Sequence, residues 1–182
     1  MVKAVLFLVI GFEEMEAMSI VDTLRRGGVE VVIVGLQAGA IEGGHGITVV
    51  PDTTIEEINV EKFDAVILPG GYPGYVNLGK DKRVLDSVKK AFEMENLVAA
   101  ICGAPSVLAK AGILEGKKAT IYPGMEAELT GAKHSNERVV VDGNIVTSQG
   151  PGTAVEFGVK LVEILAGEAR ARELKDELIA NF

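Results

Sequence analysis

The only cysteine of the chain, Cys102, follows an apolar run at residues 97–101 and precedes Gly103, Ala104 and Pro105. A buried strand followed by a helix that starts near a proline predicts a sharp strand-to-helix turn, which is a nucleophile elbow built with a thiol. Free N–H groups at the helix start favour a thiolate, so we expect a thiol pKa below the ordinary value of about 8.5. The alternative is a small buried hydrophobe, because free cysteine is among the most buried residue types.

Gly70 and Gly71 follow another short apolar run, residues 65–68, through Pro69. Two glycines after a buried strand let the backbone approach a ligand closely and offer N–H groups to an anion or oxyanion. A tight turn without any ligand is the alternative interpretation.

Three acids, Glu13, Glu14 and Glu16, stand at the start of a predicted helix over residues 13–27. Acids in a first turn ordinarily compensate the helix dipole. One of them could instead reach Cys102, and both Glu16 and Glu13 lie on or near the apolar stripe of that helix. Periodicity does not choose between them.

Strands and helices alternate along the chain, which predicts an α/β protein with a doubly wound, mostly parallel sheet. In such sheets sites form beyond the carboxyl ends of the strands, where the three segments above meet. Thr153 and Glu156 have the spacing of a capping box before an apolar helix that reaches Ala166. The expected strands cover residues 2–10, 29–36, 65–68, 97–101, 139–142 and 145–148, with a loop or hairpin at 37–50, and the other helices cover 82–95, 105–111 and 168–177.

Composition limits the function classes. The 182 residues are 48% apolar and 24% charged, which predicts one globular domain spanning residues 1–182. The net charge of −8, with only scattered basic pairs, argues against nucleic-acid binding. Apolar stretches are too short for a bilayer, and the first one lacks a cleavage site, so we expect a cytoplasmic protein.

Neither a metal nor a nucleotide site is predicted. One cysteine cannot build a multi-cysteine zinc site, and the two histidines, His45 and His134, show no ligand spacing. Gly74, Gly79 and Lys80 have the spacing of a phosphate-binding loop. The next residue is Asp81, an acid where a hydroxyl should bind magnesium, so nucleotide hydrolysis is not expected.

Four segments together resemble the ThiJ/PfpI family, and most closely its parkinsonism-associated deglycase branch. They are residues 11–16 (GFEEME), 68–71 (LPGG), 99–105 (AAICGAP) and 150–153 (GPGT), and the resemblance extends over essentially the whole chain. The resemblance implies a flavodoxin-like three-layer sandwich, a homodimer and a reactive cysteine that oxidises readily to a sulfinate. It selects Glu16 as the protonated partner of Cys102, and Gly71 and Gly103 as backbone donors beside it. With Gly70, which the position after the strand already suggests, these glycines are the expected oxyanion- or anion-binding residues.

The departures from the family pattern bear on the chemistry. Gly103 stands where the protease-like branch has a histidine, so a Cys-His peptidase would lack its general base. Tyr122, before Pro123, stands where the deglycase branch can have a histidine, and His45 matches an arginine that crosses the dimer interface. The resemblance thus implies Tyr122, His45 and Pro151 as substrate-binding residues.

We therefore expect a cofactor-free enzyme that acts through Cys102 and Glu16 on reactive carbonyls such as methylglyoxal, or on their early adducts with protein side chains. The alternative is an oxidative-stress sensor or redox-activated chaperone that uses Cys102 oxidation. An intracellular cysteine peptidase is a weaker third interpretation.

Overall fold

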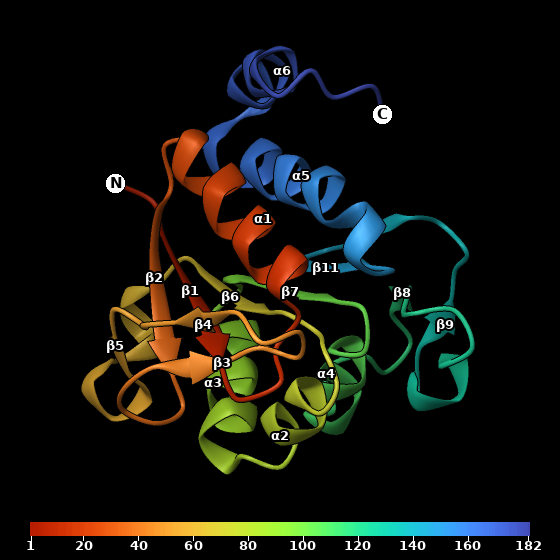
Figure 1. Ribbon diagram of the computed structural model, residues 1–182. Coiled ribbons are helices and arrows are strands. Elements are labelled where there is room, and N and C mark those ends of the chain that lie inside the picture. The colour runs from red at the N-terminus through yellow and green to blue at the C-terminus, as the bar shows by residue number, and fades with distance from the viewer.

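In the computed structural model, which describes residues 1–182, a seven-stranded sheet forms the middle of three layers (Figure 1). The strand order is β10-β11-β7-β6-β1-β2-β5, and every neighbouring pair is parallel except β10 with β11. The strands are β1 (Lys3–Leu8), β2 (Glu30–Gly35), β5 (Thr53–Thr54), β6 (Ala65–Leu68), β7 (Leu97–Ile101), β10 (Val139–Asp142) and β11 (Ile145–Ser148).

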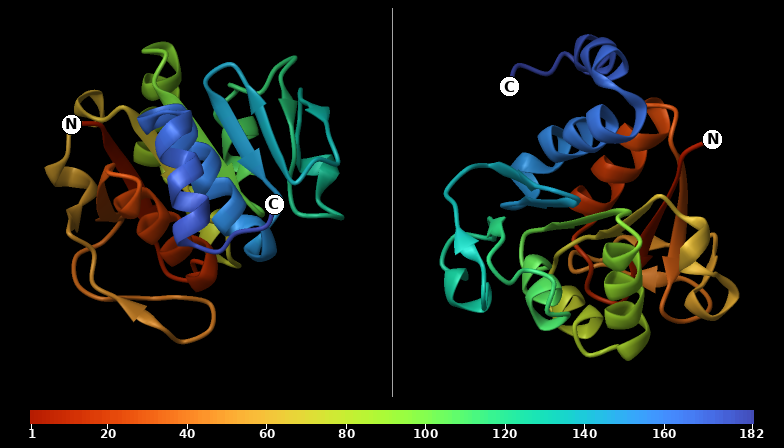
Figure 2. Two further views of the ribbon diagram at one scale, coloured as in Figure 1. Left: turned by 90° about the horizontal axis from the view of Figure 1, so that it is seen from above. Right: turned by 180° about the vertical axis from the view of Figure 1, so that it is seen from behind.

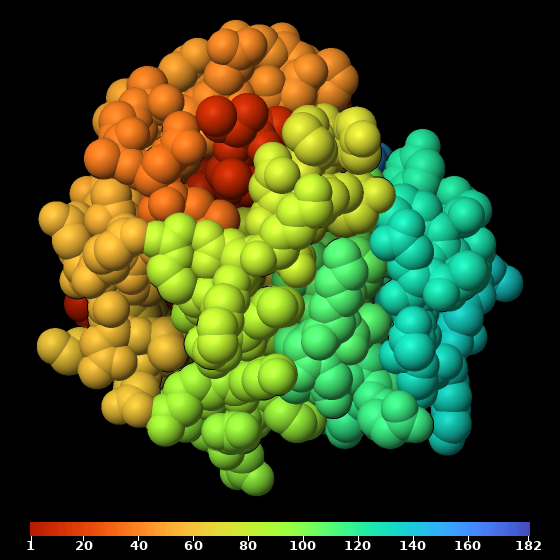
Figure 3. Space-filling model, turned by 90° about the horizontal axis from the view of Figure 1, so that it is seen from below, coloured from red at the N-terminus to blue at the C-terminus, as the bar shows by residue number.

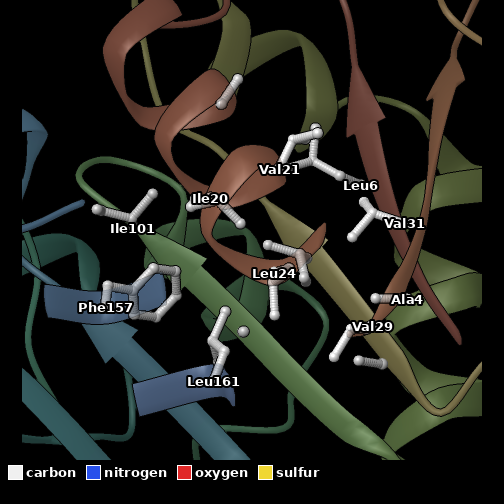
Figure 4. Packing of buried hydrophobic residues seen from close by; sticks show 14 of the residues in the cluster. Ala4, Leu6, Ile20, Val21, Leu24, Val29, Val31, Ile101, Phe157 and Leu161 are labelled. Carbon is white, nitrogen blue, oxygen red and sulfur yellow. The ribbon is translucent and has the colours of Figure 1, made fainter. Parts of the chain in front are cut away.

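The central strand β1 explains why its sequence is one apolar run. Alternate side chains of a strand point to opposite faces, and both faces of this sheet are covered. Ala4, Leu6 and Leu8 join one hydrophobic cluster, whereas Val5 and Phe7 join the other. Figure 4 shows the first cluster, with residues of α1 and α5 packed over the sheet.

Helices cover the two faces of the sheet in two groups (Figures 1 and 2). The first group is α1 (Glu14–Arg26) and α5 (Ala154–Ala166), with α6 (Glu168–Glu177) farther out against α5. On the other face lie α2 (Gly74–Leu78), α3 (Lys82–Glu93) and α4 (Pro105–Lys110). None of these helices has the length and apolar character that a membrane span requires.

Two small pairs of strands project at opposite ends of the sheet (Figure 2). The antiparallel pair β3 (Ile41–Glu42) and β4 (Thr48–Val49) confirms a hairpin in the predicted glycine-rich segment. The parallel pair β8 (Lys118–Ala119) and β9 (Lys133–His134) was not predicted, because two-residue strands leave no periodic pattern in the sequence.

The longer parallel strands run in the order second, first, third, fourth, fifth along the sheet, namely β2, β1, β6, β7 and β11. This is the flavodoxin-like order, whose switch point lies between the first and third strands. Figure 3 looks onto the face where the carboxyl ends of these strands meet the hairpin, α2 and α4. The predicted fold class is confirmed, and the loops after β1, β6 and β7 converge on this face.

One expectation about local structure needs correction. Thr153 and Glu156 form no capping box for α5, because the Thr153 hydroxyl contacts Ser148 at 2.6 Å and the Gly150 backbone, while Glu156 pairs with Arg138. The segment with phosphate-loop spacing forms the helix α2, and Asp81 caps α3 by accepting the Arg83 N–H. It therefore cannot wrap around a phosphate as a loop.

Candidate active site

Cys102 lies at the turn between β7 and α4 with a φ of +63°. This left-handed conformation is uncommon for a residue with a side chain, and it persists only where the surroundings hold it. The Cys102 N–H donates to the Ser148 carbonyl at 3.0 Å, and the Cys102 carbonyl accepts the Tyr122 N–H at 2.9 Å. The predicted nucleophile elbow is thus present, fixed by hydrogen bonds on both sides.

Three glycines pack tightly around this turn because they lack side chains. A Cβ on Gly70 would lie 2.6 Å from the Cβ of Cys102, and one on Gly103 would lie 2.7 Å from the Tyr75 ring. Gly71 has a φ of +92°, and its Cβ would meet the Glu13 nitrogen at 2.3 Å. The amides of Gly71 and Gly103 both donate to Cys102, so the glycines bring two N–H groups to the sulfur.

Glu16 is fully buried beside Cys102. Its Oε2 accepts the Gly70 N–H at 2.7 Å, whereas the buried Oε1 has no hydrogen-bond partner. Burial raises the pKa of this carboxyl to about 7, and the charge of Glu13 adds to the effect, against the hydrogen bonds from Gly70 and Cys102. Burial without a partner at Oε1 favours the neutral, protonated form of this carboxyl.

The pKa of Cys102 differs from the sequence-based expectation. Burial of the sulfur and the negative charge of ionised Glu16 raise the thiol pKa to about 12, although the amides of Gly71 and Gly103 lower it. A thiol pKa below about 8.5 is therefore wrong for the state in which Glu16 is ionised. A proton on Glu16 removes the repulsion and turns the carboxyl into a hydrogen-bond donor, so the thiolate is most stable beside protonated Glu16.

The other two acids of the first helical turn have different contacts. Glu13 caps α1, with its Oε2 accepting the Glu16 N–H at 2.6 Å. Glu14 is 5% exposed and holds the hairpin loop, accepting the N–H of His45 at 2.6 Å and the His45 Nδ1 at 2.9 Å. Of the three, only Glu16 shares a hydrogen bond with Cys102.

His45 and Pro151 lie outside the cavity at Cys102 in the single chain. The His45 side chain is 74% exposed, and its ring contacts Glu14. Pro151 starts a short 3-10 helix, while the preceding Gly150 lies against the Tyr122 ring. Of the substrate-binding residues expected from the sequence, the structure brings only Tyr122 to the cavity.

His45 also lies near two carboxylates, which the spacing of the histidines in the sequence does not reveal. A carboxylate oxygen of Glu13, a carboxylate oxygen of Glu14 and a ring nitrogen of His45 lie within 4.8 Å of one another, and atoms of these kinds can bind metal ions. Protein groups already use these atoms, because Glu13 caps α1 and Glu14 binds the His45 ring and backbone. These contacts indicate a structural cluster that anchors the hairpin to α1.

A cavity of about 210 Å³ opens at the sulfur. Sequence reasoning missed three of its residues, Tyr72, Tyr75 and Met125. Tyr72 directly follows Gly71, and that adjacency is the one signal the sequence offered. The residues that line the cavity are Gly71, Tyr72, Tyr75, Cys102, Tyr122 and Met125.

Comparison with known proteins places this arrangement in context. The model of the DJ-1/PfpI family matches residues 2–164. Protein dj-1beta of Drosophila melanogaster is 40% identical over 183 residues, which cover 99% of this chain and 98% of that protein. A deglycase of Pyrococcus abyssi is 37% identical over 157 residues, which cover 85% of this chain and 93% of that protein.

Solved structures agree with the sequence comparisons. The structure of oxidized DJ-1 from Toxoplasma gondii superposes with a TM-score of 0.96 at 34% identity, and the match covers 100% of both chains. Relatives and structures alike therefore match the chain over nearly its whole length.

Proposed function

The chain belongs to the DJ-1/PfpI family, and from this premise we propose that it is a cysteine-dependent enzyme that detoxifies reactive 2-oxoaldehydes such as methylglyoxal, free or as early adducts on protein side chains. The observation that carries the proposal is the buried Glu16 carboxyl, with its pKa near 7, beside the Cys102 sulfur. A carboxyl that changes its protonation near neutral pH suits a group that must both give and take a proton. The deglycase among the relatives supports the same substrate class.

The reaction begins when the Cys102 thiolate attacks the aldehyde carbon and forms a C–S bond. The carbonyl electron pair moves to oxygen, where the amides of Gly71 and Gly103 stabilise the charge until the proton of Glu16 neutralises it. The product is a hemithioacetal, with Glu16 now a carboxylate.

Glu16 then removes the hydrogen of the former aldehyde carbon as a proton and returns it to the neighbouring carbon. The hydroxyl proton of the first carbon passes to the oxygen of the second, which gives the thioester of a 2-hydroxy acid. Water then adds to the thioester carbon and gives a proton to Glu16; the C–S bond breaks, which releases the hydroxy acid and restores the Cys102 thiolate beside protonated Glu16. One carbon is oxidised and its neighbour reduced, so aldehyde plus water balances the hydroxy acid without an outside oxidant or cofactor.

Steady-state assay of lactate from methylglyoxal tests the proposal. We expect many molecules of lactate per molecule of protein, and none when Cys102 is replaced by alanine. Modification that stops at one adduct per Cys102 would contradict turnover.

The second candidate is an oxidation sensor or redox-activated chaperone. Tyr122 supports it, because the cavity offers a phenol where a histidine base would serve catalysis, and phenols are poor bases near pH 7. Mild peroxide should then add two oxygens to Cys102 as a sulfinate, since the chain has no second thiol for an internal disulfide. Peptide mass mapping that found oxygen only on methionine would contradict this role.

The proposal also includes a cytoplasmic homodimer, with α1 and the loop at His45 near the interface and the partner's copy of that loop near the site. Light scattering at micromolar concentration should return twice the chain mass. A monomer would remove His45 from the substrate-binding residues.

A further inference from the structure

All three tyrosines of the chain, Tyr72, Tyr75 and Tyr122, line the cavity at Cys102, and the chain has no tryptophan. The rings of Tyr72 and Tyr75 lie 6.4 Å apart between centroids and are tilted by 55°, which is a favourable geometry for aromatic pairs. The sulfur of Met125 adds a polarisable group of the kind that contacts aromatic rings well. The cavity wall is therefore an aromatic cluster, which we name the tyrosine wall (Tyr72, Tyr75 and Tyr122).

The tyrosine wall is attached to the same backbone that holds the reactive sulfur. Tyr75 packs against Gly103, and its N–H donates to the Gly71 carbonyl at 2.9 Å. The Tyr122 N–H donates to the Cys102 carbonyl at 2.9 Å. These bonds fix the backbone from which the Tyr75 and Tyr122 rings extend, and all three rings line the cavity that a substituent on the reacting carbonyl would enter.

The size of the cavity exceeds what methylglyoxal needs. An apolar cavity of about 150 Å³ is enough to bind benzene, and this one measures about 210 Å³. Apart from the Cys102 sulfur, no acidic or basic side chain lines it. Tyr72 is 77% exposed and Tyr122 is 47% exposed, so two large rings stand open to solvent at the mouth. An apolar substituent would cover them and gain favourable burial.

We propose that the preferred substrates are 2-oxoaldehydes that carry an aromatic substituent, with the substituent held by the tyrosine wall while Cys102 attacks the aldehyde carbon. This inference rests on the proposed carbonyl chemistry of Cys102. It makes Tyr72, Tyr75 and Tyr122 determinants of specificity, acting mainly on KM because the rings contact a part of the substrate that does not react.

The first test compares kcat/KM for phenylglyoxal, followed as mandelate, with kcat/KM for methylglyoxal, followed as lactate. We expect a ratio of at least about tenfold in favour of phenylglyoxal, as is typical when an apolar group fills a pocket. Tyr122→Ala and Tyr72→Ala should each reduce this ratio about fivefold or more through KM, whereas Tyr122→Phe and Tyr72→Phe should preserve it. Ile164→Ala, at an exposed position of α5, is the matched control and should not change the ratio.

The second test measures binding without turnover. The three tyrosine rings, labelled with ¹³C for NMR, all report on this cavity, so acetophenone and acetone can be titrated as unreactive ketones. We expect acetophenone to shift the ring signals at a concentration at least about tenfold lower than acetone. Tighter binding of methylguanidinium than of acetophenone would overturn the inference in favour of a cation-binding cage.

The outcomes separate this inference from the proposed function. If neither aldehyde is turned over but acetophenone still binds tenfold better than acetone, the proposed function fails and aromatic recognition is supported. If both aldehydes are turned over equally and both ketones bind equally, the proposed function stands and the inference is overturned.

Discussion

Glu14 and Glu16 lie two residues apart on one helical turn, both buried, yet their surroundings shift their pKa values in opposite directions. Burial acts to raise the pKa of Glu14, but hydrogen bonds from the ring and backbone of His45 and from Ile47 outweigh it and leave the pKa lowered. Glu16 has a single backbone donor and a thiol, and burial prevails. Glu16 lies deeper than Glu14 and faces fewer donors, and the two differences together decide which carboxyl is a fixed anion and which can carry a proton.

The comparison divides this end of the molecule into a reactive side, Cys102 with Glu16, and an anchoring side, Glu14 with His45. Removing the sulfur should produce the largest effect. We expect Cys102→Ala to reduce kcat/KM for methylglyoxal by at least about a thousandfold, because no covalent adduct can form. Thermal unfolding is the control and should show a midpoint close to that of wild type, since alanine fits the space of the thiol.

Glu16→Gln should reduce kcat about a hundredfold or more, because an amide keeps a hydrogen-bond donor but cannot transfer a proton. Glu14→Gln is the matched control on the same turn. We expect it to change kcat less than about threefold while it lowers the free energy of unfolding by about 1–3 kcal/mol, through weaker hydrogen bonds to the hairpin. If Glu16→Gln and Glu14→Gln reduced kcat equally, Glu16 would have no catalytic role that Glu14 lacks.

The pH dependence of the Cys102 alkylation rate shows whether Cys102 or Glu16 carries the first negative charge. The pair of Cys102 and Glu16 should release its first proton at or below about pH 7, with the charge settling on sulfur. Glu16→Gln should keep that midpoint low, and Glu16→Leu, which removes the donor, should raise it by more than about one pH unit. A wild-type midpoint above about pH 10 would mean that the first charge rests on Glu16 instead.

The smallest effect concerns the anchoring side and its pH dependence. The ion pair raises the pKa of His45 above 6.5, so its contribution to stability is complete below pH 6.5 and is lost as pH rises through the higher folded value. The pKa of Glu14 is lowered below 4.5, so its contribution is complete above pH 4.5 and is lost as pH falls through the lower value.

The difference in unfolding temperature between wild type and His45→Gln should therefore be greatest between about pH 4.5 and 6.5 and shrink on either side. We expect it to reach only about 1–2 °C, because the exposed ring is screened by solvent and salt. Calorimetric scans across pH measure it, and a difference that does not depend on pH would exclude an ion pair.

Sequence reasoning predicted the sheet, its long helices and the elbow, because each leaves a local signal. The run at residues 97–101 is apolar on both faces, and Cys102 and Pro105 mark the turn that follows it. The choice among the three acids left no such signal, since all three prove to be buried and the partners of Glu14 and Glu16 lie far along the chain. Gly70, which binds Glu16, is 54 residues away.

The dependence of the Cys102 pKa on the protonation of Glu16 was also beyond local reasoning. The helix start and the glycine amides are visible in the sequence, but the burial of the sulfur and the charge of ionised Glu16, which raise the thiol pKa, depend on segments far apart in the chain. Tyr72 and Tyr75 were missed for a related reason. Tyr75 lies in α2, which has only five residues, Gly74–Leu78, and too few turns to show a period, and Tyr72 lies in the turn before it.

The hydrogen bond from Cys102 to Ser148 has a consequence for how the protein is made. Ser148 belongs to β11, which pairs with β7 and is synthesised long after Cys102 has left the ribosome. The contacts that shape the elbow are thus of high sequence separation, and such contacts form late in folding. A nascent chain should carry an ordinary thiol, slow to react at neutral pH, until its last strand docks. Reactivity of Cys102 would then mark the molecules that have finished folding.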